Sequence, residues 1–309
     1  MTISKNDYGI CMFAYNTPEL DYVKFSLLAA LLAKKHMGNI PVTLITTKGD
    51  KEWLFDSHDH SIINSAIDNF VVEEHVEHKS NIRTHWDSPW ASFKSEFKNS
   101  NKHQVFELSP YQKTLLIDTD FLIFNNCLSQ LFENDSSLAL YKTAKALDLK
   151  NPHLNEQILS DGSEIPMLWS TVIYFEKTQY SKLFFELWKH VSENYDFYKQ
   201  RYQLPGNLYR TDYAVTISDH IMSNFGANNS QIINLPDEPM MYLDQKDDIS
   251  KCYKDGSMIC LVTDRKENWK STITRHEKTN IHAMNKRAIE RHYNSLIEYA
   301  LLKKEINNG

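Results

Sequence analysis

The sequence predicts an α/β fold in which helices flank a mostly parallel central sheet. Short apolar runs alternate with stretches whose apolar residues recur at helical spacing. The links between these segments are short, and the first three form a strand, helix, strand pattern. Such a unit implies a Rossmann-like parallel sheet with right-handed crossovers, whose ligands bind at the carboxyl ends of the strands.

The first half of the chain supplies four candidate strands and one long helix. "YGICMFA" (8–14) is an apolar run typical of a buried strand. The helical face that follows it consists of Val23, Leu27, Leu28, Leu31 and Leu32. Further strands are expected at "PVTLIT" (41–46), at "FVVE" (70–73) and at "TLLID", which begins at Thr114.

The second half continues the alternation, with one interruption. A loop is expected over about 145–166 because the stretch carries Asn-Pro, Asp-Gly and Ile-Pro breaks. Helices are expected near 127–133, 181–199, 212–225 and from about Ile289 to Leu301, and strands at 138–141, 170–175, 231–235 and 257–263. The apolar stripes of these helices indicate packing against a core.

Bulk composition excludes several classes of protein. A chain of 309 residues can bury a large core, as one large domain or two modest ones. A net charge of −6 gives no general attraction for nucleic acid. No signal-peptide pattern and no apolar run of membrane-spanning length is present, so a cytoplasmic protein is expected. The four cysteines form no C-x-x-C pair and are expected to be reduced thiols.

The segment "TLLIDTDFLI" ends an apolar strand with two aspartates, Asp118 and Asp120. Residues two apart in an extended segment point to the same side, so both carboxylates can reach one point past the strand. Their repulsion favours binding of a divalent cation, and these hard oxygen ligands suit Mg²⁺ or Mn²⁺. The alternative is that Asp120 caps a turn and Asp118 is solvated, and the spacing alone does not decide between the two.

The block "FELSPYQKTLLIDTDFLIFNN" resembles the signature of GT-A fold glycosyltransferases, in which a D-x-D pair holds a metal on the diphosphate of a nucleotide-sugar. The chain is similar to glycogenin-like, galactosyltransferase-like and bacteriophage-type members. The resemblance implies a single GT-A domain over 1–309, with a nucleotide-sugar-binding half (1–126) and an acceptor-side half that includes the C-terminal helix (127–309). A phage-encoded chain would work in the host cytoplasm.

The resemblance also implies roles for other residues. "FAYNTPELDYV" matches the nucleotide-contacting loop, and "LWSTVIYF" matches an acceptor-side strand. "RTDYA" places Asp212 where related enzymes carry an aspartate facing the sugar, and "IHAMNK" supplies His282 as third metal ligand and Lys286 on the donor phosphates. The substrate-binding residues implied in this way are Ala14, Asn16, Tyr22, Trp169 and Lys286.

Several of these positions also have a simpler interpretation. The lysine-rich stretch 94–104 is either a solvated helix face or a place where Lys102 meets the nucleotide. Asp212 lies at an expected helix start, where a carboxylate is favoured as a cap. His282 is one of thirteen histidines, and "HDH" (58–60) is interpreted as a surface loop.

The predicted function is transfer of a sugar from a nucleoside diphosphate donor, expected to be a UDP-sugar, with Mn²⁺ or Mg²⁺ as cofactor. The acceptor hydroxyl belongs to a glycan, a protein, a lipid-linked sugar or a modified nucleobase. A glycogenin-like mechanism retains the anomeric configuration, whereas Asp212 acting as a general base inverts it. Two alternatives stay open: a sugar nucleotidyltransferase, and an inactive module of the same fold that binds a glycan or a partner.

Overall fold

The computed structural model describes residues 7–74, 81–149, 157–160, 163–226 and 229–302. Its largest element is a seven-stranded sheet with the order β13, β8, β12, β6, β1, β2, β3. The four strands β6, β1, β2 and β3 are parallel to one another, and β12 runs antiparallel to β6 and β8. The predicted α/β class with a mostly parallel central sheet is therefore confirmed.

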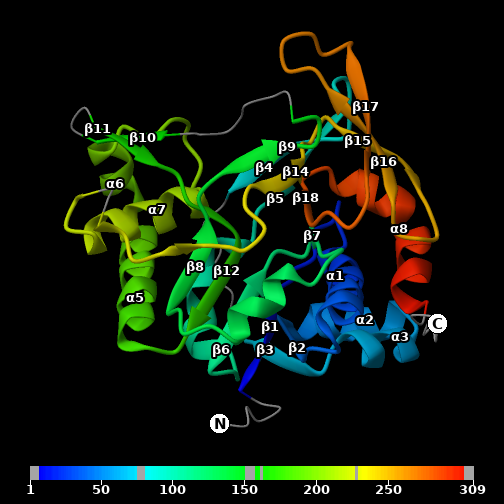
Figure 1. Ribbon diagram of the computed structural model, residues 1–309, viewed down its shortest axis with the longest axis horizontal. Helices are drawn as coiled ribbons and strands as arrows, with labels where there is room; N and C mark the ends of the chain where they lie inside the picture. The colour runs from blue at the N-terminus through cyan, green and yellow to red at the C-terminus, as the bar shows by residue number, and fades with distance from the viewer. Residues whose placement is uncertain (1–6, 75–80, 150–156, 161–162, 227–228, 303–309) are drawn as a thin grey trace.

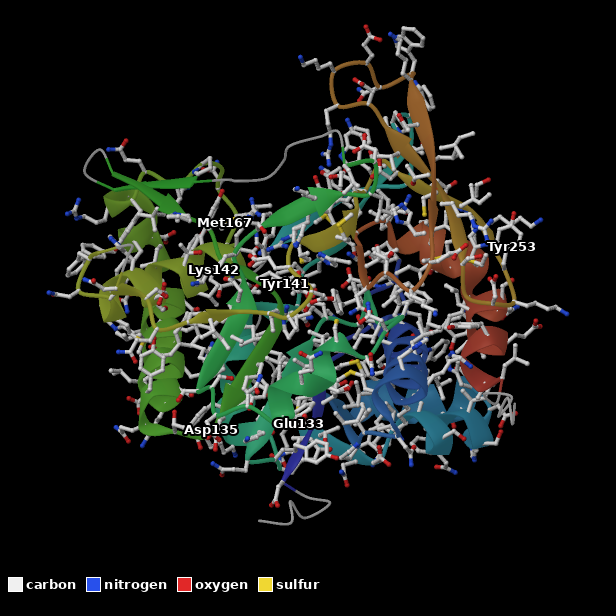
Figure 2. The ribbon with its side chains drawn as sticks, viewed as in Figure 1. Glu133, Asp135, Tyr141, Lys142, Met167 and Tyr253 are labelled. Atoms are coloured by element: carbon white, nitrogen blue, oxygen red, sulfur yellow. The ribbon has the colours of Figure 1, made fainter. Side chains whose placement is uncertain are left out.

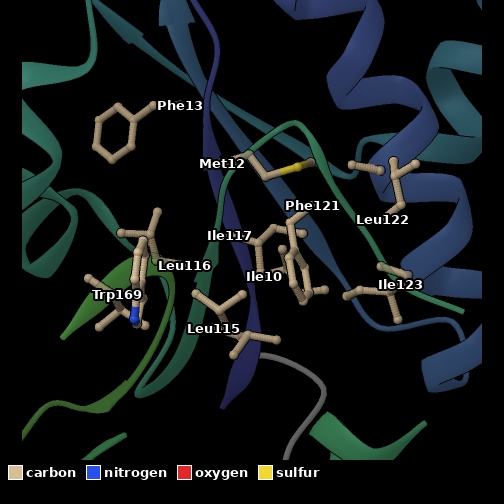
Figure 3. Close-up of a cluster of buried hydrophobic side chains, with 14 of the residues drawn as sticks. Ile10, Met12, Phe13, Leu115, Leu116, Ile117, Phe121, Leu122, Ile123 and Trp169 are labelled. Carbon is tan, nitrogen blue, oxygen red and sulfur yellow. The ribbon is translucent and has the colours of Figure 1, made fainter. Parts of the chain in front are cut away.

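The parallel half of the sheet follows the predicted order. Its elements are β1 (Tyr8–Phe13), α1 (Tyr22–Met37), β2 (Val42–Thr47), α2 (Lys48–Ser57), α3 (His60–Ala66), β3 (Asn69–Glu73) and β6 (Lys113–Ile117). Helix α1 begins where Asp21 accepts a hydrogen bond from the backbone of Lys24, and it ends at Gly38 in the left-handed conformation. Apolar side chains of β1 and β6 pack together in the core (Figure 3).

Gly9 in β1 has a steric reason to lack a side chain. A Cβ at this position would lie 2.4 Å from the ring of Tyr111. The hydroxyl group of Tyr111 lies 2.8 Å from the Thr43 hydroxyl of β2, within hydrogen-bonding distance. The ring thus crosses β1 at the glycine and fixes the segment that leads into β6.

The second half of the chain supplies the remaining strands of the large sheet, of which β12 runs antiparallel to its neighbours, and further helices. Its elements are η2 (Cys127–Phe132, a 3₁₀ helix), β8 (Leu138–Tyr141), β12 (Trp169–Glu176), α5 (Gln179–Glu193), α6 (Tyr195–Arg201), α7 (Thr211–Met222) and β13 (Ile233–Asn234). Helices α5, α6 and α7 lie on one side of the molecule, and α1, α2, α3 and α8 lie on the other (Figure 1). Met167 and Tyr253 mark these opposite sides in Figure 2.

Within the described ranges, four smaller sheets accompany the large one. The first has the order β7 (Phe121–Leu122), β18 (Ile281–Ala283), β14 (Met240–Leu243), β9 (Ala144–Ala146). The others are β15 (Asp248–Cys252), β16 (Met258–Thr263) and β17 (Ser271–His276); the hairpin of β4 (Ile82–Trp86) and β5 (Ser92–Glu96); and the pair β10 (Gln157–Ser160) and β11 (Ser163–Pro166). The last helix, α8 (Lys286–Leu301), packs against α1 and β15.

Some predicted elements are wrong in detail. The helix expected over 181–199 is two helices that meet at Asn194. The stretch 94–104 holds the end of β5 and a 3₁₀ helix, η1 (Asn99–Gln104), which leads into α4 (Val105–Leu108). The expected loop over 145–166 contains most of β9 and all of β10 and β11, although 150–156 and 161–162 lie outside the described residues.

Other expectations agree with the structure. All four cysteines are free thiols. Across the described ranges, no helix combines the length and the apolar character that crossing a bilayer requires. The "HDH" stretch is a loop only in part, because α3 begins at His60 and Asp59 caps it by accepting a hydrogen bond from the backbone of Ser61.

Candidate functional site

The two aspartates lie in the turn through which the chain leaves the large sheet. Strand β6 ends at Ile117, and the backbone N–H of Asp118 donates to the carbonyl of Thr171 in the adjacent strand. The carbonyl of Asp118 then accepts from the N–H of Phe121, which begins β7. Backbone hydrogen bonds of Asp118 therefore fix this turn at the carboxyl end of β6.

His282 joins the aspartates through strand pairing. It lies in β18, opposite Phe121 of β7, and the N–H of Ala283 donates to the carbonyl of Asp120. The Nε2 atom of His282 lies 3.4 Å from Oδ2 of Asp120, and its Nδ1 atom lies 3.2 Å from the Thr171 hydroxyl. One ligand atom from each of Asp118, Asp120 and His282 lies within 4.8 Å of the others.

Each aspartate is also paired with a lysine. The ammonium group of Lys102 contacts Asp118, and that of Lys286 contacts Asp120. Lys102 is only 4% exposed, so the prediction of a solvated helix face at 94–104 is wrong at this residue. Lys286 is the first residue of α8, whose N-cap Asn285 is fully buried and bonds the carbonyls of Asp87 and Asp247.

The two carboxylates differ in their electrostatic balance. Burial raises the pKa of Asp118 above its usual value, although the charge of Lys102 opposes the rise. Burial also acts to raise the pKa of Asp120, but the charges of Lys286 and His282 outweigh it and hold that pKa well below its usual range. Asp120 is thus the more firmly ionised of the two.

These residues line a cavity of about 1000 Å³ at the end of β6. The cavity is lined by residues from both predicted halves of the chain, 1–126 and 127–309. The predicted site residues among them are Tyr22, Lys102, Asp118, Asp120, Trp169, Asp212, His282 and Lys286.

Two predicted nucleotide contacts do not lie on the wall. Ala14 is fully buried, and the side-chain oxygen of Asn16 accepts a hydrogen bond from the backbone of Val23 at the start of α1. Their neighbour Tyr15 lines the cavity instead.

Asp212 has partners that a helix cap would not have. Its Oδ1 atom accepts hydrogen bonds from the backbone N–H and the hydroxyl group of Ser170, at 2.9 and 2.7 Å. Its Oδ2 atom lies 3.4 Å from the guanidinium of Arg210, which occupies the N-cap position of α7. Burial acts to raise the pKa of Asp212, but Arg210 and the bonds from Ser170 bring it below its usual value.

Sequence reasoning predicted neither β4 nor its contribution to the cavity. Arg83 and His85 both line the cavity, and they are two residues apart on one strand. The guanidinium of Arg83 stacks over the ring of Phe97 at 3.5 Å and donates to the carbonyl of Tyr209. The only local signal was the alternation in "IRTHW", which does not show which face meets a cavity.

The residues present fit a divalent metal ion. Two carboxylates and one imidazole form the mixed oxygen and nitrogen set that Mn²⁺ or Mg²⁺ accepts. Metal–ligand bonds of about 2.0–2.1 Å allow two ligand atoms of one metal to lie at most about 4.2 Å apart. The three ligand atoms lie within 4.8 Å of one another, so the widest pair would approach by at most about 0.6 Å on binding. The Thr171 hydroxyl lies within hydrogen-bonding distance of Nδ1 of His282 and orients the ring, as partners of metal-bound histidines commonly do.

Several solved structures that resemble this chain are glycosyltransferases. Glycosyltransferase GlyE of Streptococcus pneumoniae TIGR4 aligns with 12% identity and a TM-score of 0.42, over 75% of this chain and 46% of its own. The galactosyltransferase LgtC in complex with donor and acceptor sugar analogs aligns with 13% identity and a TM-score of 0.41, over 68% of this chain and 69% of its own. Mouse xyloside xylosyltransferase 1 aligns with 12% identity and a TM-score of 0.39, over 68% of this chain and 81% of its own.

The chain spans less than half the length of GlyE. No protein-family model matches the sequence, and no curated protein matches it. Because the structural matches combine low identity with TM-scores under 0.5, the function has to be inferred from the site itself.

Proposed function

We propose that this protein is a metal-dependent glycosyltransferase of the GT-A type, which transfers a sugar from a nucleoside diphosphate donor to a hydroxyl group. The observation that carries the proposal is one cavity whose wall combines the Asp118, Asp120 and His282 cluster with several cationic side chains. A nucleotide-sugar requires this combination, because its leaving diphosphate must be held and its developing charge stabilised.

The charge of the wall supports an anionic donor. Six cationic side chains and four carboxylates line the cavity. The cations are Arg83, Lys98, Lys102, Arg210, Arg265 and Lys286, and the carboxylates are Asp118, Asp120, Asp212 and Asp244. The chain as a whole carries a net charge of −6, so basic groups are concentrated here. A cleft with an excess of positive charge attracts anionic ligands even when the net charge of the protein opposes them.

Asp118, Asp120 and His282 would hold the metal, which supplies Lewis-acid stabilisation of charge on the leaving diphosphate. The ammonium groups of Lys102 and Lys286 lie beside the same carboxylates and are placed to donate to phosphate oxygens. In the reaction, the bond between the anomeric carbon and the phosphate oxygen breaks and its electron pair stays on the leaving diphosphate. The acceptor oxygen bonds to that carbon, and its proton passes to the departing diphosphate oxygen.

Asp212 is proposed to stabilise positive charge at the anomeric carbon as an ionised carboxylate. A general base works best when its pKa lies near the operating pH. The pKa of Asp212 is lowered, despite burial, by Arg210 and Ser170. This environment disfavours Asp212 as a general base, and we therefore propose that the anomeric configuration is retained.

A binding module without turnover is the second candidate. The observation that favours it is that both carboxylate oxygens of Asp212 already have partners, Ser170 and Arg210. A module of this kind would bind a nucleotide-sugar and leave it intact.

A thermal-shift screen tests the proposal. UDP-, GDP-, CMP- and dTDP-sugars are added with and without Mn²⁺, because a ligand that binds only the folded state stabilises it, by about 2.7 kcal/mol at one hundred times its Kd. We expect one nucleotide class, UDP, to raise Tm only when Mn²⁺ is present. Absence of any shift at millimolar concentrations would remove the donor proposal, and binding without release of UDP would favour the non-catalytic module.

A further inference from the structure

The acid pair of the cavity is already neutralised by side chains of the chain itself. The ammonium groups of Lys102 and Lys286 carry two positive charges and contact Asp118 and Asp120, which carry two negative charges. The lysine side chains are 5% and 12% exposed, so water screens these pairs little. In this arrangement the carboxylates do not need a metal ion to offset their repulsion.

A divalent cation that enters alone therefore meets an unfavourable site. It would bring two further positive charges next to two ammonium groups, and it would bind the carboxylates that these ammonium groups contact. Both ammonium groups would lose their acceptors in a nearly buried position, which is costly for a charged group. Metal binding without a new anion is thus opposed by Lys102 and Lys286.

A diphosphate removes this opposition. Its oxygens are strong acceptors for ammonium groups, and its negative charge offsets the charge of the metal. A lysine ammonium sits on a flexible four-carbon stem, so it can turn from one oxygen to a nearby one. The metal ion then binds the carboxylates, and the lysine ammonium groups bind the diphosphate, within one cavity.

We propose that Lys102 and Lys286 act as exchangeable counter-ions: they hold the aspartates in the free protein and move onto the diphosphate when a divalent metal takes the carboxylates. Metal and nucleoside diphosphate therefore bind with positive coupling, and each raises the affinity of the other by the same factor. This inference rests on the proposed function, because it assigns the diphosphate to the same cavity.

The experiment measures binding of Mn²⁺ alone, UDP alone and Mn²⁺ with UDP by titration calorimetry, and checks free Mn²⁺ by electron paramagnetic resonance. For the wild type we expect Mn²⁺ to bind at least tenfold more tightly when UDP is saturating. Lys102→Met removes one counter-ion, so it should raise the affinity for Mn²⁺ alone about tenfold and reduce the coupling.

Two further variants separate this role from general effects of charge and folding. Lys98→Met removes a cation from the same cavity wall, but the ammonium of Lys98 donates to the carbonyl of Asn16, whereas Lys102 and Lys286 are the lysines that contact Asp118 and Asp120. It should leave the affinity for Mn²⁺ alone unchanged. Lys102→Arg keeps the charge beside Asp118 and should keep weak binding of Mn²⁺ alone, and Tm reports whether each variant is folded.

The outcomes distinguish the inference from the function on which it rests. If the wild type binds UDP with Mn²⁺ but Lys102→Met binds Mn²⁺ alone no better, the exchange is wrong and the proposed function stands. If the wild type binds no UDP under any condition, the proposed function fails, and the coupling fails with it. Equal gains in Lys98→Met and Lys102→Met would also overturn the exchange, because they would reflect overall charge.

Discussion

At the scale of single residues, the metal cluster gives the most direct prediction. Asp118→Asn and Asp120→Asn should each abolish metal-dependent binding of the donor, because they remove the charged ligands. His282→Ala should weaken Mn²⁺ binding in the presence of UDP by one to two orders of magnitude, about 1.4 to 2.8 kcal/mol. Calorimetry measures all three variants. A matched control is His190→Ala, in α5 and outside the cavity wall, and unchanged affinity in Asp120→Asn would refute the metal site.

Asp212 should separate binding from chemistry. Asp212→Asn keeps the shape of the side chain and one acceptor for Ser170, but it removes the negative charge. We expect sugar transfer to fall by at least about a hundredfold, the scale of a lost electrostatic contact in a transition state. Donor affinity should stay within a few-fold of the wild type. A variant that transfers sugar at the normal rate would show that this carboxylate has no part in the reaction.

The buried imidazole of His103 makes stability depend on pH. Burial, with a smaller contribution from Lys189, lowers the pKa of His103 to about 4, whereas an unfolded histidine titrates near 6.5. Between these values the unfolded chain binds more protons, so the free energy of unfolding falls as pH falls from 6.5 to 4, by up to about 3 kcal/mol. Urea unfolding across this range should give a flatter profile for His103→Phe, and identical profiles would contradict the lowered pKa.

At the scale of elements, the crossing of Tyr111 over β1 predicts a specific intolerance. Gly9→Ala places a Cβ 2.4 Å from the ring of Tyr111, so the ring must move from its place beside Thr43. We expect a loss of about 1–3 kcal/mol in the free energy of unfolding, typical of overpacking in a core. Equilibrium urea unfolding measures the loss.

Gly49 in α2 provides the control for this substitution. The atom nearest to its added Cβ is 4.0 Å away, so Gly49→Ala meets no clash. Replacing glycine by alanine where the backbone permits it stabilises a protein by about 0.4–1 kcal/mol, so this variant should be more stable than the wild type. Equal changes in the free energy of unfolding for the two substitutions would show that a clash with Tyr111 does not cause the loss in Gly9→Ala.

The elements that sequence reasoning predicted are those whose own residues specify them. Strands β1 and β6 are nearly continuous apolar runs because they are buried on both faces. The hairpin of β4 and β5 carries polar and charged residues on a partly exposed surface, so its sequence has little strand signal. Strands of two or three residues, such as β7 and β18, depend on their neighbours in the sheet and have no period to detect.

At the scale of the whole molecule, the same division applies to the site. The spacing of Asp118 and Asp120 is local, so a sequence can indicate a metal site there. His282 reaches them only because β18 pairs with β7, and resemblance to a family was the sole guide to it. The pairing of Lys102 with Asp118 was missed because a lysine is expected in solvent unless a buried partner from another element is known.

The central position of β18 also sets the time at which the site can exist during synthesis. Strand β18 lies between β7 and β14, and it follows Asp120 by about 160 residues. At about 5–20 residues per second, a ribosome needs roughly 8 to 30 seconds to make that interval. Throughout it, the growing chain has both aspartates and Lys102 but neither His282 nor Lys286. The complete cluster of Asp118, Asp120 and His282 therefore forms only after β18 has been synthesised and has paired with β7.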